Sequence, residues 1–307
     1  MKDFRNIIFV LIIATFLLQM YVSKEDAKVK NEKLTVSLST FALYDIAKNI
    51  SQDTLELVMI LPLGVDAHSF EPTPKLMAKI MRSQLVIYSG AGLEPWTSSF
   101  EFKSKVIDMS KSVKLLKPKD KHDGHAHNHG HNAVDPHYWL DIQNMISATE
   151  LISEEFIKIS PENKQVYKSN SEKYIAKLKS IDAKYKKALS NCKKETIIVN
   201  HNAFSYLSSN YGFHVEALNG LSPDAQPSAK DMVRVIEHVR EHDVKTIFFE
   251  SFVNDKAMKS IAQEAKVSVE VLQPLGNITR DEAQKNLSYE DIMLDNLKKI
   301  SKALVCE

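Results

Sequence analysis

The sequence predicts an α/β fold of two Rossmann-like lobes with parallel sheets, joined by one long rigid helix. Short runs rich in β-branched and aliphatic residues alternate with helical segments in both halves of the chain, which is typical of parallel sheets covered on both faces. A long segment without Gly or Pro separates the two halves. About 280 residues follow an N-terminal apolar segment, which is more than a typical single domain contains.

Residues 31–160 are expected to form the first lobe. Its strands are predicted over Leu34–Thr40, Leu55–Leu61 and Gln84–Gly90, with a short fourth strand over Val106–Met109. Helices are predicted around Tyr44–Ile50, from Thr73-Pro74 through Arg82, and from the end of the string DPHYWLD to Ile159. Short apolar or alternating runs define the strands, and apolar residues at helical spacing define the helices.

Residues 161–190 are predicted to form the connecting helix. Ser160-Pro161 is a favourable pair for an N-cap and a first helical turn. No Gly or Pro follows as far as Leu189, and apolar residues recur mostly at helical spacing at Val166, Tyr167, Tyr174, Leu178, Ile181, Tyr185 and Leu189. About 29 residues give a helix roughly 43 Å long. One lobe does not need that length, so the helix should run along both.

Residues 191–307 are expected to form the second lobe, in which the alternation is repeated. Strands are predicted over Thr196–Asn200, Phe213–Leu218, Thr246–Glu250 and Val267–Leu272. Helices are predicted over Ala203–Asn210, Ser228–His242, Asp255–Ala265 and Tyr289–Leu304.

The N-terminus has the features of a secretory signal, to which we assign residues 1–23. Lys2 and Arg5 precede an apolar run from Ile7 to Leu18, which falls short of the ~20 residues that span a bilayer. No cysteine comes directly after this run, so a lipoprotein anchor is not expected. Tyr21 makes a poor cleavage site before Ser23, so cleavage and retention as an anchor both stay open. We expect an exported, periplasmic protein.

Charge and cysteine content narrow the function further. The 40 Lys and Arg residues nearly balance the 39 Asp and Glu residues, which argues against nucleic acid as a partner. Cys192 and Cys306 are the only cysteines. They could form one disulfide in an exported chain or remain as buried thiols, and the sequence does not decide between these alternatives.

A histidine-rich segment, residues 121–131, points to metal chemistry. It contains five of the eleven histidines, namely His122, His125, His127, His129 and His131. Its other residues are mostly small or polar, so it should form a solvated loop rather than part of a core. Neutral imidazole is a common ligand for zinc, copper and nickel, and flexible backbone favours weak, interchangeable sites. The alternative is an acid-responsive or merely solubilising loop.

Three other histidines fall where an α/β fold places its ligands. His201 directly follows the predicted strand TIIVN, His68 follows the strand LELVMIL, and His137 lies in the string DPHYWLD. Open α/β sheets bind ligands beyond the carboxyl ends of their strands, so the three side chains should converge in the cleft between the lobes. Three imidazoles suit a tetrahedral Zn²⁺ site. Glu250 and Gln273 also fall at strand ends. The alternative for any one of the three histidines, taken alone, is a structural role.

The remaining histidines are interpreted as structural. His214 lies within a predicted strand, and His238 and His242 lie on one exposed helical face without the glutamate of an HExxH motif. Asp135 and Glu71 are in turn-forming strings and are interpreted as possible helix caps.

Five strings resemble, in order, the motifs of the zinc and manganese substrate-binding proteins of ABC transporters, the ZnuA/TroA-like cluster. They are GVDAHSFEPTPKLMAKI, DPHYWLD, VNHNAF, IFFES and LQPLG. The resemblance implies two lobes bridged by a rigid helix, with metal between the lobes. It implies that His68, His137 and His201 are ligands, and that a histidine-rich loop precedes the DPH motif in zinc members. Manganese-preferring relatives typically have glutamate in place of the third histidine, so His201 indicates zinc.

The string LQPLG departs from the family pattern. The family usually has LDPLG, so Gln273 replaces a carboxylate ligand with an amide. The fourth ligand position therefore stays open between Gln273, Glu250 and water.

The resemblance implies a monomeric, extracytoplasmic protein that captures Zn(II) as its transported ligand and delivers it to an ABC transporter permease for high-affinity import. The alternatives are a protein that binds manganese or a broader set of divalent metals, and a periplasmic zinc buffer or chaperone. A zinc hydrolase, with Glu250 or Glu71 as base, is the least favoured alternative. The sequence contains no HExxH motif, nucleophile elbow or phosphate loop, so we do not expect an enzyme.

Overall fold

The computed structural model describes residue 19 and residues 33–117, 134–221, 227–251 and 256–307. The signal assignment (1–23, apart from Gln19) and the histidine-rich segment 121–131 therefore lie outside the described residues. Residues 35–307 form one compact unit. No helix in the described ranges has the length and apolarity to cross a membrane.

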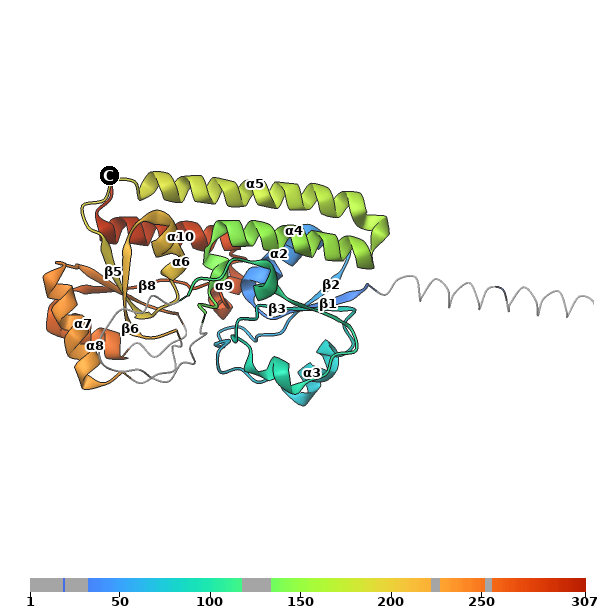
Figure 1. Ribbon diagram of the computed structural model, residues 1–307, viewed down its shortest axis with the longest axis horizontal. Coiled ribbons are helices and arrows are strands. Elements are labelled where there is room, and N and C mark those ends of the chain that lie inside the picture. The colour runs from blue at the N-terminus through green and yellow to red at the C-terminus, as the bar shows by residue number, and fades with distance from the viewer. Residues whose placement is uncertain (1–18, 20–32, 118–133, 222–226, 252–255) are drawn as a thin grey trace, which may run out of the picture. The chain divides into compact units, whose positions relative to one another are not determined.

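Two parallel four-stranded sheets form the framework (Figure 1). The first sheet contains β1 (Thr35–Leu38), β2 (Glu56–Met59), β3 (Leu85–Tyr88) and β4 (Lys105–Asp108) in the order β2-β1-β3-β4. The second contains β5 (Thr196–His201), β6 (His214–Asn219), β7 (Thr246–Phe249) and β8 (Ser268–Val271) in the equivalent order β6-β5-β7-β8. All neighbouring strands in both sheets are parallel. The predicted fold class is confirmed.

Helices pack against both sheets, and apolar strand residues are buried between them. The first lobe contains α2 (Phe41–Ser51), α3 (Pro74–Ile80), α4 (Ile142–Ile159) and the short 3₁₀ turns Pro95–Ser99, Met109–Ser112 and Tyr138–Leu140. The second contains α6 (Ser205–Tyr211), α7 (Ala229–Glu241), α8 (Lys256–Ala265), α9 (Arg280–Gln284) and α10 (Tyr289–Leu304). In each sheet the first strand lies between the second and the third. The strand order therefore reverses direction at the first strand. This switch point is where such sheets open a crevice for ligands.

The sequence prediction missed α9. Thr279 caps this five-residue helix, because its hydroxyl accepts from the backbone N–H of Glu282 and the Glu282 carboxylate accepts from the backbone N–H of Thr279. This reciprocal capping box was visible in the sequence as Thr279 and Glu282 three residues apart.

The connecting helix begins later than predicted. A 3₁₀ turn occupies Pro161–Asn163, and the α-helix α5 spans the 25 residues Lys164–Ala188, which is about 37 Å. Ser160 does not cap it as expected. The Ser160 hydroxyl instead donates to the Glu162 carboxylate and accepts from the Asn163 amide, so it is not available to the first helical N–H groups.

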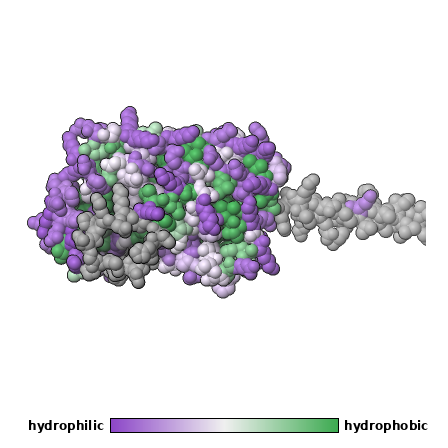
Figure 2. Space-filling view, viewed as in Figure 1, coloured by the Kyte–Doolittle hydropathy of each residue, from purple (hydrophilic) through white to green (hydrophobic). Residues whose placement is uncertain are grey.

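The helix α5 contacts both lobes, as its length predicted. Its first half bonds to the region of α2 and its second half to α10, through Tyr167 to Thr54, Asn170 to the Ile50 carbonyl, Tyr174 to Asp45, and Tyr185 to the Met293 carbonyl. The opposite face is rich in exposed lysines, and the edge of the molecule along α5 is predominantly hydrophilic (Figure 2). The helix therefore fixes the spacing of the lobes through one buried polar and apolar face.

The two cysteines form a disulfide between Cys192 and Cys306. The bond joins the segment that follows α5 to the C-terminal end of α10, across a sequence separation of 114 residues. Backbone hydrogen bonds from Lys194 to Leu304 and from Glu307 to Asn191 support the same contact. The alternative of free thiols is therefore excluded.

Candidate metal site between the two lobes

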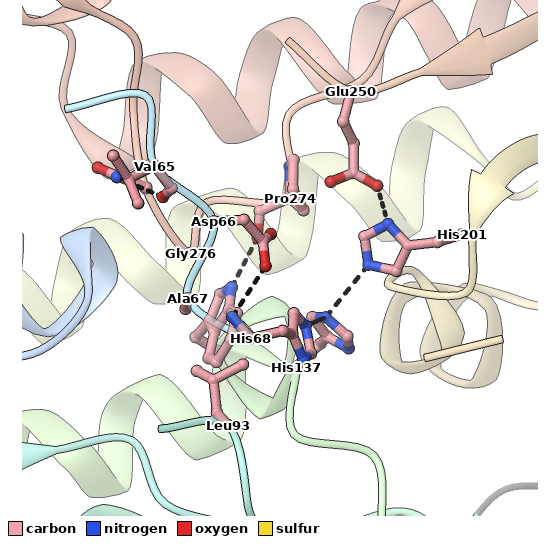
Figure 3. Close-up of a pocket in the computed structure, with 12 residues that line it drawn as sticks. Val65, Asp66, Ala67, His68, Leu93, His137, His201, Glu250, Pro274 and Gly276 are labelled. Atoms are coloured by element: carbon pink, nitrogen blue, oxygen red, sulfur yellow. Dashed lines mark hydrogen bonds and ion pairs between the residues drawn. The ribbon is translucent and has the colours of Figure 1, made fainter. Parts of the chain in front are cut away.

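Three histidines from separate segments of the chain meet between the lobes (Figure 3). His68 lies in the loop after β2, His137 immediately before the 3₁₀ turn Tyr138–Leu140, and His201 at the end of β5. The Nε2 atom of His137 lies 3.4 Å from Nε2 of His68 and 3.4 Å from Nε2 of His201. Nitrogens bound at 2.0–2.1 Å to a tetrahedral zinc lie about 3.3–3.4 Å from one another. Two of the three spacings therefore match those of ligands around one ion, and all three ligand atoms lie within 4.8 Å of one another.

Carboxylates orient two of the three rings. Asp135 Oδ1 accepts from both the backbone N–H and the Nδ1 of His137, at 2.9 and 2.8 Å. The Glu250 carboxylate forms an ion-pair contact with Nδ1 of His201. If His137 and His201 are neutral and donate from Nδ1, their Nε2 atoms carry lone pairs that face each other. A cation bound between these atoms would remove the repulsion between the lone pairs. Hydrogen bonds of this kind fix the tautomer and raise the basicity of metal-ligating histidines.

The protonation equilibria of two histidines are shifted in opposite directions. Burial, followed by the proximity of His137 and His201, lowers the pKa of His68 to about 3. Burial also disfavours the charged form of His201, but the adjacent Glu250 carboxylate outweighs this effect and raises the pKa of His201 above its usual value. His68 is therefore a neutral ligand at any physiological pH, whereas protons compete with metal for His201.

Residues of both lobes line the pocket around the histidines. The first lobe supplies Val65, Asp66, Ala67, Leu93 and Trp139, and the second supplies Glu250, Pro274, Gly276 and Asn277. The Trp139 ring lies 5.4 Å from the His137 ring, between centroids. His137 and His201 are almost fully buried, and His68 is half-buried. The site can therefore enclose a small ion and exclude most solvent.

Both protein candidates for a fourth ligand contact other groups, although Glu250 Oε2 has no hydrogen-bond partner in the described part of the chain. The Gln273 amide donates to the two oxygens of Glu282, at 3.1 and 2.9 Å, and its own oxygen accepts from the Leu275 N–H. Gln273 is not among the residues that line the pocket. Glu250 lines the pocket and contacts the far nitrogen of His201. Glu71 is exposed on its loop and does not line the pocket.

The sequence interpretation of Asp135 as a helix cap was wrong. Asp141 caps α4 instead, and Asp135 holds His137. The spacing Asp-x-His carried this signal, because a carboxylate two residues earlier can reach both the backbone and ring N–H groups of the histidine. His214 lies in β6 as predicted, and His238 and His242 lie at the end of α7, with only His242 fully exposed.

The fold and the histidine cluster define a class of protein, the solute-binding proteins that hold a metal ion between two α/β lobes. The family described as "Zinc-uptake complex component A periplasmic" (ZnuA) matches residues 36–303. The chain belongs to the ZnuA family, as its motifs predicted.

Individual relatives agree with this membership. The chain is 33% identical over 291 residues to the "High-affinity zinc uptake system protein ZnuA" of Bacillus subtilis, covering 92% of this chain and 91% of that protein. It is 29% identical over 297 residues to the "Zinc-binding lipoprotein AdcA" of Streptococcus pneumoniae, covering 94% of this chain but 59% of AdcA. The chain thus spans little more than half the length of that relative.

Solved structures share the fold. The "Metal-dependent Lipoprotein YcdH" of Bacillus subtilis is 32% identical and superposes with a TM-score of 0.76, covering 89% of this chain and 100% of that chain. The Zn(II)-bound ZnuA-like domain of Streptococcus pneumoniae AdcA is 28% identical, with a TM-score of 0.75 and coverage of 89% and 99%. The ZnuA family consists of solute-binding transport proteins rather than enzymes, so the zinc hydrolase alternative is rejected.

Proposed function

We propose that this protein captures Zn(II) outside the cytoplasm and delivers it to an ABC permease for high-affinity zinc import. One observation supports this proposal most strongly. The Nε2 atom of His137 lies 3.4 Å from the Nε2 atoms of both His68 and His201, as between ligands of a tetrahedral zinc ion, and carboxylates contact two of the three rings. The names of relatives such as ZnuA of Bacillus subtilis support zinc as the cargo.

We assign His68, His137 and His201 as the zinc ligands. A site of three imidazoles favours zinc over manganese, because manganese prefers oxygen ligands. The carboxylates of Asp135 and Glu250 then balance the charge of the ion without binding it directly. Water is the fourth ligand that fits best, since the Gln273 amide is bonded to Glu282 and Glu250 is bonded to His201.

Substitution of Gln273 tests this view of the fourth position. In Gln273→Asp the new carboxylate would face the Glu282 carboxylate that now accepts from the amide. We expect zinc affinity to stay within about threefold of wild type, and thermal stability to fall because a buried hydrogen bond is replaced by like-charge repulsion. Chelator competition and thermal unfolding measure the two effects. Zinc binding that tightens tenfold or more would instead make position 273 a ligand position.

The histidine-rich segment is proposed as a secondary, weaker metal-binding loop. The small and polar residues between these histidines offer no apolar core to hold the ligands in place, so zinc should bind there more weakly than at His68, His137 and His201. Deletion of residues 122–131 should therefore lower zinc stoichiometry and leave one tight site intact. Zinc binding at these weak sites should also be lost near pH 6 and below, because protons compete with zinc for imidazole nitrogens. Titration calorimetry of the full-length and deleted proteins measures both effects. Loss of the tightest site on deletion would instead make the histidine-rich segment a primary ligand of zinc.

We further propose that the exported protein is a monomer without a lipid anchor. The only cysteines, Cys192 and Cys306, are joined in a disulfide, so neither offers a thiol for lipidation. Intact mass of the protein isolated from cells would detect any lipid, and light scattering would give its oligomeric state.

The import function itself is tested in cells. A strain that lacks the protein should grow poorly under zinc chelation and take up ⁶⁵Zn slowly, and the wild-type gene should restore both. The His137→Ala variant should restore neither. Normal ⁶⁵Zn uptake in the deletion strain, combined with altered zinc tolerance, would favour the buffer alternative instead.

A further inference from the structure

We infer that Asn277 is a positioning residue for His68, and that it links this ligand to the opposite lobe. The inference rests on the proposed role of His68 as a zinc ligand. It concerns the loop 273–278, which follows β8 in the second lobe and crosses to the first lobe at the edge of the histidine cluster.

The side-chain amide of Asn277 holds the turn that leads to His68. Its Nδ2 donates to the carbonyl of Pro62 at 2.6 Å and to the carbonyl of Val65 at 2.8 Å. A backbone bond from Gly64 to the Ile278 carbonyl, 2.9 Å, fixes the same turn. Asn277 is only 2% exposed, so both amide hydrogens are used in a place where water does not replace them.

The turn passes this constraint to the histidine within three residues. After Val65, Asp66 accepts from the backbone N–H of His68 at 2.8 Å. The His68 ring then reaches Nε2 of His137 at 3.4 Å. His137 and His201 are each oriented by a carboxylate, Asp135 or Glu250. The loop 62–66 is the part of the site that depends on a group from the other lobe.

The loop is anchored at its start in the second lobe and at its middle against Trp139 of the first lobe. The Asn296 side chain, on α10, bonds both the N–H and the carbonyl of Gln273, at 3.0 and 2.7 Å. Trp139 Nε1 donates to the Pro274 carbonyl at 2.6 Å. A Cβ atom added at Gly276 would lie 3.3 Å from the Trp139 ring. The loop therefore has little freedom to shift, and Asn277 can act as a fixed reference for the His68 turn.

The consequence is a specific loss when the amide is replaced by a carboxylate. In Asn277→Asp two carbonyl oxygens would face a group with no N–H to donate, so the turn should open and His68 should leave its position. We expect zinc affinity to fall about 10- to 100-fold, the range found when groups that orient metal ligands are changed.

A double-mutant cycle distinguishes this from a general structural effect. If Asn277 acts through His68, Asn277→Asp should weaken zinc binding by no more than about threefold when His68 is already alanine, but should keep its full effect when His201 is alanine. Zinc affinity of each variant is measured by titration calorimetry well below its unfolding temperature. Asn170→Asp is the matched control, since that buried amide also donates to a carbonyl, of Ile50, away from the histidines. It should lower stability without changing zinc affinity.

Unchanged zinc affinity in Asn277→Asp would overturn the inference, and so would a full loss that persists in the His68→Ala background. If Asn277→Asp does not fold, Asn277→Ser supplies the same cycle with a smaller perturbation. The proposed function is judged separately: it fails if wild-type protein does not bind zinc tightly, if His68→Ala and His137→Ala bind it as wild type does, or if a strain that lacks the protein takes up ⁶⁵Zn normally.

Discussion

Replacement of His137 by alanine should cause the largest loss of zinc affinity among single substitutions at the site. Its Nε2 lies 3.4 Å from the Nε2 atoms of both His68 and His201, so it is the central nitrogen of the three. We expect a loss of about 100-fold or more for His137→Ala and of at least tenfold, about 1.4 kcal/mol, for His68→Ala and His201→Ala. Competition with a chelator of known affinity measures these losses.

The fold should survive these changes, because the three side chains come from loops and a strand end. His214→Ala is the control. This exposed histidine begins β6 in the second sheet and is remote from the three histidines of the site. Its zinc affinity should equal that of wild type. Wild-type affinity in any two of the three site variants would refute the ligand assignment.

Substitution of Glu250 by glutamine should weaken zinc binding in a way that depends on pH. The carboxylate orients His201 and makes it a better ligand, so its loss should cost about 10- to 100-fold in affinity at high pH. It also raises the pKa of His201 above the ordinary value of 6.5. In the wild type, protons therefore begin to compete with zinc for His201 at a pH above 6.5. Without the carboxylate this competition begins at lower pH. The ratio of the wild-type zinc affinity to that of Glu250→Gln should therefore become smaller as the pH falls from 8 to 6.

The measurement is zinc affinity of the wild type and Glu250→Gln across this pH range. Glu155→Gln provides a matched control, since Glu155 is a buried carboxylate that pairs with Lys105 and Lys158 rather than with a histidine. It should leave zinc affinity unchanged at every pH. A constant ratio between wild type and Glu250→Gln would mean that the carboxylate does not govern the protonation of His201.

The convergence of His68, His137 and His201 could be predicted from sequence because the fold makes it a general expectation. Short apolar runs identified both parallel sheets, and parallel sheets bring loops at the carboxyl ends of their strands together. His201 ends β5 and His68 follows β2, so pattern alone placed them at such edges. The existence of one long connecting helix likewise followed from the absence of Gly and Pro, although α5 is 25 residues long rather than 29.

Other features depend on contacts between distant residues and were not accessible in that way. The choice between a disulfide and two thiols required the C-terminal end of α10 to lie beside the segment after α5. The partner of Gln273 is Glu282, on a helix that the sequence prediction missed. Asp135 resembles a helix cap in sequence, and only its distance to the His137 ring shows what it binds. The amide of Asn277 reaches across more than 200 residues of sequence to Pro62.

The central claim is that one tightly bound zinc ion lies between the lobes on the three histidines. A crystal structure of protein loaded with one equivalent of zinc, with anomalous data at the zinc absorption edge, tests it most directly. We predict one dominant anomalous peak at about 2.0–2.1 Å from the Nε2 atoms of His68, His137 and His201, with a water molecule in the fourth position. A dominant peak away from these three nitrogens, or one that contacts fewer than three of them, would contradict the claim.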